Sequence, residues 1–216
     1  RRDVATSDTQ QVVGAWLPVS EGETIAGKYR VEKLIGSGGM GVVMAAFHLQ
    51  LNQRVALKFM QPGLSADGQS AMRFQREARA AARLSTMHVG KVLDLDSLPN
   101  GTPFVVMEYL DGEGLDRRLL REKTIPVASA LEWARQALTA LAEAHAAGIV
   151  HRDVKPANLF LAKRPDGSEL VKVLDFGIAK SADPDIEHGL SSTSSRLMLG
   201  SPPYMPPEQF TPGAEI

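Results

Sequence analysis

The sequence predicts an α+β fold made of a strand-rich part and a mainly helical part that follows it. Short apolar segments separated by turn residues recur between residues 29 and 109, which is typical of strands. Residues 126–147 instead carry apolar side chains at helical spacing, begin with a proline and end before a glycine, which is typical of a helix. With 216 residues and 44% hydrophobic side chains, the chain can bury a substantial core.

The composition argues against several function classes. The formal net charge is -1 and the lysines and arginines are scattered, so no basic face for nucleic acid or for an anionic membrane is expected. The absence of cysteine excludes disulfides and thiolate metal sites and is compatible with a reducing cytoplasm. Because no apolar run could cross a bilayer and no signal-like segment begins the chain, we expect a cytoplasmic domain with no membrane contact from this segment.

Residues 1–23 are polar and lack clear periodicity, so we interpret them as an N-terminal arm or linker, with Trp16 and Leu17 as a candidate docking point. Further on, the alanine-rich residues 67–84 predict a helix. The inward stripe expected on this helix consists of Met72, Phe74, Ala78, Ala81 and Ala82. The stripe expected on the helix at 126–147 consists of Leu131, Ala134, Leu138 and Leu141.

A glycine-rich segment at residues 36–41 lies between two strand-like segments. Glycines let backbone N–H groups approach a polyphosphate without interference from a Cβ atom. The G-x-G-x-x-G spacing is weak evidence by itself, because dinucleotide-binding folds use it too, but there a helix follows the glycines. Here residues 42–47 are strand-like, and a turn leads to a second strand at 54–60 that contains Lys58. This order favours a glycine-rich hairpin over a dinucleotide-binding turn.

Residues 151–158 form a polar stretch between two apolar segments, so they are expected on a short loop held by rigid neighbours. Asp153 has the chemistry to orient a hydroxyl and take its proton, and Lys155 can neutralise developing negative charge. Asn158 can ligate a hard cation through its amide oxygen. The alternative is a polar loop in which the Asp-x-Lys spacing is incidental, and only the rest of the chain distinguishes the two.

Two further segments follow this loop. An apolar hairpin at residues 159–174 leads into the tripeptide D-F-G at 175–177. A stretch with few apolar residues then contains five consecutive hydroxyl side chains at 191–195 and ends in a proline-rich string at 200–208. Each string says little alone, but their order along the chain is informative.

Taken in order, these strings resemble the signatures of the protein kinase family. The polar loop reads H-R-D-x-K-x-x-N, which is similar to the serine/threonine branch, and its style resembles the eukaryotic-like kinases of bacteria. Six signatures occur in the family's order between about residues 29 and 208. The resemblance implies a two-lobe protein-kinase-like fold, with a small antiparallel sheet plus one helix in the N-lobe and a mainly helical C-lobe.

The resemblance also implies domain boundaries. Residues 24–107 correspond to the N-lobe, and residues 108–216 correspond to the hinge and part of the C-lobe, including the activation segment. Because the family has further helices beyond the position of Ile216, we expect this C-lobe to be incomplete and the chain to be a fragment of a longer protein. Any membrane anchor of that protein is expected in segments outside this one.

The resemblance implies ATP as the phosphate donor and Mg²⁺, or alternatively Mn²⁺, as its metal. Lys58 would contact the α- and β-phosphates and be held by Glu77, although a glutamate among arginines is more often a surface charge. Asp153 would orient the acceptor hydroxyl, Lys155 would stabilise the transferred charge, and Asn158 would hold metal. The implied reaction moves the γ-phosphate of ATP to serine or threonine hydroxyls of protein substrates.

The same resemblance implies the residues that bind the nucleotide. Backbone groups from Glu108 to Leu110 would hydrogen-bond adenine. Val43 would cover the base, and Met107 would close the back of the pocket. Asp175 would bind the metal that bridges the phosphates. The full implied set consists of Ile35, Gly36, Ser37, Gly38, Gly39, Met40, Gly41, Val43, Ala56, Lys58, Met107, Glu108, Leu110, Phe160 and Asp175.

Two other functions stay open. A nucleotide-binding pseudokinase that acts as a scaffold would share the fold, although no catalytic position is substituted here. A small-molecule phosphotransferase would share the Asp and Asn of the loop. Lys155 and the hydroxyl-rich segment favour a protein acceptor over a small molecule.

The hydroxyl-rich residues 191–195 also suggest regulation. In the family, an arginine before the catalytic Asp often pairs with a phosphorylated activation segment, and Arg152 holds that position. A phosphate there would bring a charge of about -1.5 to -2 and three acceptor oxygens. We therefore predict autophosphorylation within this run, with Thr193 as the favoured position, and self-association for a reaction in trans. The alternative is a serine-rich loop with no regulatory role.

Overall fold

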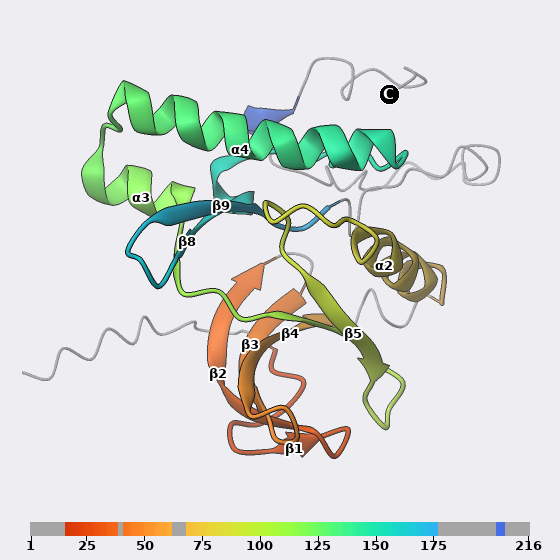
Figure 1. Cartoon of the computed structure of the whole chain (residues 1–216). Coiled ribbons are helices and arrows are strands. Elements are labelled where there is room, and N and C mark those ends of the chain that lie inside the picture. Colours follow the sequence, from red (N-terminus) through yellow and green to blue (C-terminus); the bar gives the residue numbers. More distant parts are fainter. Residues whose placement is uncertain (1–15, 39–40, 62–67, 177–201, 206–216) are drawn as a thin grey trace, which may run out of the picture.

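The computed structural model describes residues 16–38, 41–61, 68–176 and 202–205. Within them, six strands form one sheet, three strands form a second sheet, and three α-helices pack against these sheets (Figure 1). The order of elements confirms the predicted α+β fold, with a strand-rich part before a mainly helical one. None of the described helices combines the length and the apolar composition needed to cross a bilayer.

The larger sheet is antiparallel and strongly curved, as Figure 1 shows. Its strands lie in the spatial order β1-β2-β3-β4-β6-β5. Their bounds are Thr24–Ile25 for β1, Tyr29–Gly38 for β2, Gly41–His48 for β3, Gln53–Met60 for β4, Val92–Ser97 for β5 and Pro103–Glu108 for β6. Register shifts between Val31 and Lys33 and between Leu34 and Gly36 interrupt the pairing of β2 with β3. Such bulges increase the local bend of a strand.

Large aromatic and apolar side chains fill the core of this sheet. The ring of Phe104 has its centroid 5.3 Å from that of Phe59 and 6.2 Å from that of Tyr29. All three side chains are fully buried. Val19 belongs to the same core, and Trp16 packs against it. The described end of the predicted N-terminal arm is therefore attached to the sheet.

Helix α2, Gly68–Ala81, packs beside strands β5 and β6. Its buried residues are Phe74, Ala78 and Ala81. These three confirm part of the predicted stripe, but Met72 and Ala82 are exposed, so the prediction was wrong for them. Met72 lies two positions before Phe74, which places it about 200° around the helix from the buried face.

The second part combines a small sheet with two helices. The sheet has the order β7-β8-β9, with β7 at Gly112–Gly114, β8 at Leu159–Lys163 and β9 at Glu169–Val173. Helix α3, Leu115–Glu122, and helix α4, Val127–Ala146, lie on one side of it (Figure 1). The predicted hairpin and the helix predicted at residues 126–147 are confirmed, and β9 packs against α4.

Helix α4 contacts the small sheet through alanines rather than leucines. Its buried residues are Gln136, Ala137, Ala140 and Ala144. Leu131 and Leu138 are 66% and 63% exposed, and Ala134 is exposed too, so the predicted stripe was wrong for all but the partly buried Leu141. Adjacent helical residues point about 100° apart, so a face of small alanines against β9 turns the neighbouring leucines away.

Candidate active site

In the polar loop at residues 151–158, the candidate catalytic residues contact one another. Asp153 and Lys155 form an ion pair with 3.0 Å between Oδ2 and Nζ. The buried Asn158 donates from Nδ2 to the carbonyl oxygen of Asp153 at 2.8 Å and to its Oδ2 at 3.2 Å. A short turn at Pro156–Asn158 brings the amide back toward Asp153. The loop thus assembles the three residues whose chemistry the sequence singled out.

His151 ties this loop to the segment that carries Asp175. Its ring is only 1% exposed. Nδ1 accepts a hydrogen bond from the Asp153 amide at 3.2 Å, and Nε2 donates to the Leu174 carbonyl at 2.8 Å. Burial lowers the pKa of His151, so the ring is neutral with its proton on Nε2. The ring also packs on Phe176, with centroids 4.8 Å apart.

The sequence analysis quoted His151 as part of a motif but gave it no role. Its hydrogen bond to Leu174 spans 23 residues of the chain, and no local pattern encodes that contact. The available signal was its place directly after an apolar segment, Ile149 and Val150, which favours burial of the ring.

Asp175 and its neighbour Leu174 are held by contacts from both parts of the molecule. In the second part, the Leu174 amide donates to the carbonyl of Asn158 at 2.9 Å and holds the two loops together. Asp175 itself has a φ of +59°, a left-handed conformation that is uncommon outside glycine. From the first part, Nζ of Lys58 lies 2.5 Å from Oδ1 of Asp175. Lys58 is only 5% exposed, so it is not the solvated outward lysine that strands usually carry.

Glu77 lies on α2, close to the strand pair that contains Lys58. Helix α2 packs against Val105, which is the cross-strand partner of Lys58. Glu77 is partly buried, and its Oε2 atom is shielded from solvent. The ion pair described for Lys58 joins it to Asp175, so its pairing with Glu77 stays a prediction.

The glycine-rich segment forms the end of the β2–β3 hairpin, which confirms the strand-turn-strand prediction. Gly38 pairs with Gly41 across the hairpin. Gly41 has a φ of +148°, and a Cβ atom there would lie 1.8 Å from the carbonyl oxygen of Phe59. The sheet itself therefore requires this glycine. Gly39 and Met40 lie outside the described residues.

The other residues of the predicted nucleotide set come from both sheets. Ile35, Gly36 and Ser37 lie on β2, Val43 on β3, Ala56 and Lys58 on β4, Met107 and Glu108 on β6, Leu110 after β6, and Phe160 on β8. The register sets Val43 opposite Lys58 and Ala56 opposite Met107, so the strands bring these four together.

Two oxygen donors in this region suit a hard cation. Asn158 uses Nδ2 toward Asp153, which leaves Oδ1 as the atom able to ligate a metal, and Asp175 supplies a carboxylate. Such a pair fits Mg²⁺, which usually takes one or two protein oxygens together with phosphates and waters. Over the described ranges, no group of three or more His, Cys, Asp or Glu side chains forms a metal site.

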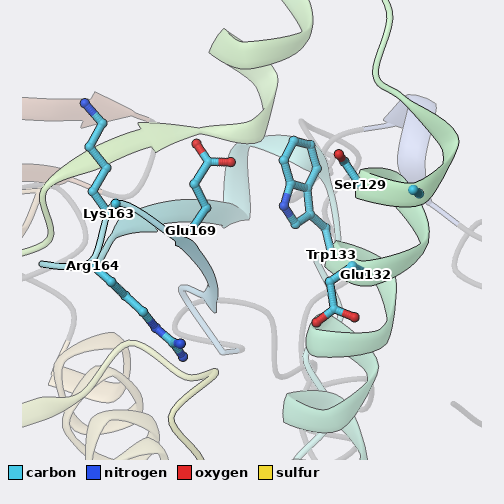
Figure 2. A pocket seen from close by; sticks show the side chains of 8 residues that line it. Ser129, Glu132, Trp133, Lys163, Arg164 and Glu169 are labelled. Atoms are coloured by element: carbon cyan, nitrogen blue, oxygen red, sulfur yellow. The ribbon is translucent and has the colours of Figure 1, made fainter.

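A separate hollow of about 620 Å³ lies between the start of α4 and the β8–β9 hairpin (Figure 2). It is lined by Ala128, Ser129, Glu132, Trp133, Lys163, Arg164, Gly167 and Glu169, none of which belongs to the predicted site. Its carboxylates are already paired, Glu132 with Arg135 and Glu169 with Arg118. We therefore assign this hollow no part in the chemistry.

Known proteins are similar in sequence to this chain over most of its length. A model of the protein kinase domain matches residues 29–214. The serine/threonine-protein kinase pkn3 of Myxococcus xanthus is 43% identical over 204 residues, which cover 94% of this chain and 36% of pkn3. The serine/threonine-protein kinase PknA of Mycobacterium tuberculosis is 40% identical over 192 residues, which cover 87% of this chain and 42% of PknA.

A solved structure shares the fold as well. The kinase domain of M. tuberculosis PknI matches with a TM-score of 0.66 at 32% identity, over 81% of this chain and 68% of that one. This match confirms the expected two-lobe, kinase-like fold. The chain spans 36% and 42% of the lengths of these two curated relatives. By sequence and by fold, this chain belongs to the protein kinase domain family.

Proposed function

We propose that this chain is the catalytic domain of a serine/threonine protein kinase that uses ATP and Mg²⁺. The observation that carries the proposal is the meeting of Lys58 from one sheet with Asp175, which is hydrogen-bonded through its neighbours to the loop of Asp153 and Asn158. The relatives pkn3 and PknA are both named serine/threonine-protein kinases, which supports the same activity here.

Asp153 and Lys155 would act on the acceptor. Asp153 accepts a hydrogen bond from the substrate hydroxyl and orients it for attack, and Lys155, 3.0 Å away, stabilises charge on the transferred group. Asn158 holds Asp153 in place through two hydrogen bonds. Because the transition state of phosphoryl transfer is loose, positioning and charge stabilisation supply most of the catalysis.

Lys58, Glu77 and the glycine-rich hairpin would hold the phosphates, and the backbone from Glu108 to Leu110 would hold adenine. Mg²⁺, or alternatively Mn²⁺, would supply positive charge that offsets the negative charge of the phosphates. Asn158 and Asp175 are the residues proposed to ligate it. The rest of the predicted nucleotide set lines the same region under this proposal.

The proposed boundaries follow from these roles. Residues 24–107 form the N-lobe, residues 108–216 form the hinge and part of the C-lobe, and residues 1–23 form an arm. The ion pair between Lys58 and Asp175 supports a nucleotide position between the two lobes, because its partners come from opposite sides.

The proposed partners are proteins that offer serine or threonine hydroxyls, together with a second copy of the kinase for autophosphorylation in trans. A formal net charge of -1 and lysines and arginines that are scattered along the sequence support a chain that binds neither nucleic acid nor an anionic membrane. We place the domain in the cytoplasm, where ATP is abundant, and any membrane anchor in other segments.

The proposed switch is phosphorylation within residues 191–195, with Thr193 as the favoured position and Arg152 as the partner of the phosphate. That segment lies outside the described residues. Support comes from Arg152, which directly precedes Asp153 and has its Nε atom shielded from solvent. Phosphopeptide mapping of active protein tests it, beside a variant with alanine at all five positions. Full activity in the fivefold variant would remove the switch from this segment.

The experiment measures transfer of labelled γ-phosphate from ATP to a generic protein substrate by the full-length protein. Asp153→Asn is expected to lose at least about a hundredfold in rate, because it removes the group that takes the proton. Asp166→Asn, in the exposed β8–β9 turn, is the matched control and keeps the wild-type rate. Equal transfer by Asp153→Asn and wild type refutes the proposal.

The same assay separates the two alternative functions. ATP binding without transfer to any acceptor would identify a nucleotide-binding scaffold. Transfer to aminoglycoside or choline-like acceptors in place of protein would identify a small-molecule phosphotransferase. A protein kinase instead labels protein serine and threonine.

A further inference from the structure

Strand β9 carries a charged residue among buried apolar ones. Leu170, Val171 and Val173 are buried, and Lys172 between them is only 9% exposed. Taking an ammonium out of water is costly, and apolar replacement of a buried ion pair is often neutral or stabilising. Stability alone therefore does not explain a lysine at this position. A requirement to hold two parts of the molecule in a fixed arrangement explains it better.

Lys172 is bonded to the end of the larger sheet. Its Nζ lies 2.6 Å from Oε1 of Glu108, the last residue of β6, and 3.2 Å from the carbonyl oxygen of Val89. The same Oε1 accepts a hydrogen bond from the Lys91 amide at 2.7 Å. One carboxylate oxygen thus joins the small sheet, the end of the larger sheet and the segment that leads into β5.

The backbone around these side chains is joined as well. The Gly90 amide donates to the carbonyl of Val173 at 2.9 Å, and the Val173 amide donates to the carbonyl of His88 at 2.7 Å. A Cβ atom at Gly90 would lie 2.7 Å from Cδ2 of Leu174, so a side chain there would have to displace the end of the Leu174 side chain. Residues 88–91 are therefore held tightly against β9.

Both ends of the proposed nucleotide site depend on this strand. Glu108 begins the backbone that is proposed to bind adenine, and Asp175, which pairs with Lys58, follows Lys172 by three positions. Because β9 ends at Val173 and Asp175 lies only two residues beyond it, the short chain from Lys172 to Asp175 limits the distance between the adenine end and the metal end.

We propose that Lys172 is a positioning residue for nucleotide binding. By holding the Glu108 carboxylate, Lys172 fixes the hinge backbone relative to Asp175, so that adenine and the phosphates are bound at the same time. Lys172 acts through Glu108 and does not touch the nucleotide. The inference rests on the proposed kinase function and adds a determinant of nucleotide affinity to it.

The test is calorimetric titration of full-length wild type and of Lys172→Met with MgADP and, separately, with adenosine. Adenosine has no phosphates, so it reports on the hinge end alone. The dissociation constants for both ligands are expected to rise by about tenfold in the variant. The rate at saturating ATP is expected to stay within about twofold, because no group of the catalytic loop has changed.

Weaker nucleotide binding with an unchanged maximal rate would distinguish a positioning role of Lys172 from a purely structural one. A purely structural role would lower the amount of active protein, and so the maximal rate, while the remaining molecules bound nucleotide normally. The matched control is Lys28→Met, which removes a lysine whose partners, Asp94 and Asp96, lie within the larger sheet. It is expected to leave both dissociation constants unchanged.

The variant Glu108→Gln provides a second, independent test of the proposal. If the two side chains act as a pair, the double variant binds MgADP no more weakly than Lys172→Met alone, whereas additive losses overturn the proposal. Unchanged or tighter binding of both ligands by Lys172→Met also overturns it. Failure of wild type to bind MgADP at all would instead refute the kinase function, so the two failures are distinguishable.

Discussion

The six-stranded sheet and helix α4 bury apolar surface in opposite ways. The sheet encloses its largest side chains, including Phe59 and Phe104, whereas α4 packs through Ala137, Ala140 and Ala144 and exposes Leu138. In a strand, alternate residues share a face, so apolar composition and pairing identify the buried side. When a helix has apolar residues on two faces, the element that it packs against determines which face is buried. In α4, the face of small residues packs against strand β9.

The largest effect expected from this difference is on the sheet. Phe104→Ala removes a ring that contacts both Phe59 and Tyr29 and leaves a cavity, so it should cost about 3–5 kcal/mol of stability. Hydrogen-exchange mass spectrometry is the measurement, because it reports the two parts separately. Protection should fall first in β4 and β6. A first loss in α4 would mean that the two parts share one core.

A smaller effect is expected on the two faces of α4. Ala140→Leu inserts bulk where Ala140 is fully buried and should cost about 1–3 kcal/mol by overpacking. Leu138→Ala, two positions earlier on the exposed side, should stay within about 0.5 kcal/mol. Hydrogen exchange in α4 and β9 measures both. A larger cost for Leu138→Ala would mean that the packed face has been assigned wrongly.

The smallest expected effect is the change in stability with pH that His151 causes. Burial lowers the pKa of His151 below the ordinary value of about 6.5. Its contribution to stability is complete above that value, where the ring is neutral in both states. As the pH falls below about 6.5, the unfolded chain binds a proton first, so stability decreases until the folded-state pKa is reached.

Thermal unfolding at about pH 7.5 and about pH 5.5 checks this sign. Wild type should lose more stability at the lower pH than His151→Gln, which has no ring to protonate. Equal losses would mean that His151 is not held neutral. Lys28→Met, in the turn between β1 and β2, serves as the control and should follow wild type.

Much of the fold could be predicted from the sequence, because local patterns encode it. The β2–β3 hairpin follows from the order of glycines and strands, and the β8–β9 hairpin follows from two apolar runs around a turn. The polar loop could be predicted for the same reason, since Asp153, Lys155 and Asn158 contact one another within six positions.

What could not be predicted depends on residues far apart in the chain. Lys58 meets Asp175 across 117 positions, and Lys172 meets Glu108 across 64. A lysine on a strand usually faces solvent, so the strand pattern alone does not predict that Lys58 and Lys172 are buried. For Lys58, only the family resemblance implied an inward position. The exposure of Met72 and Leu138 has the same origin, because the packed face of a helix is chosen by what it packs against.

The central claim is that a residue of the larger sheet and a loop of the second part form one site for phosphoryl transfer. Transfer of labelled phosphate by full-length Lys58→Met tests it most directly. Loss of this oriented charge should cost at least about 3 kcal/mol in the barrier, roughly a hundredfold in rate, with the fold intact by circular dichroism. Arg79→Glu, an exposed change on α2, should keep nearly the full rate. Wild-type turnover by Lys58→Met would contradict the claim.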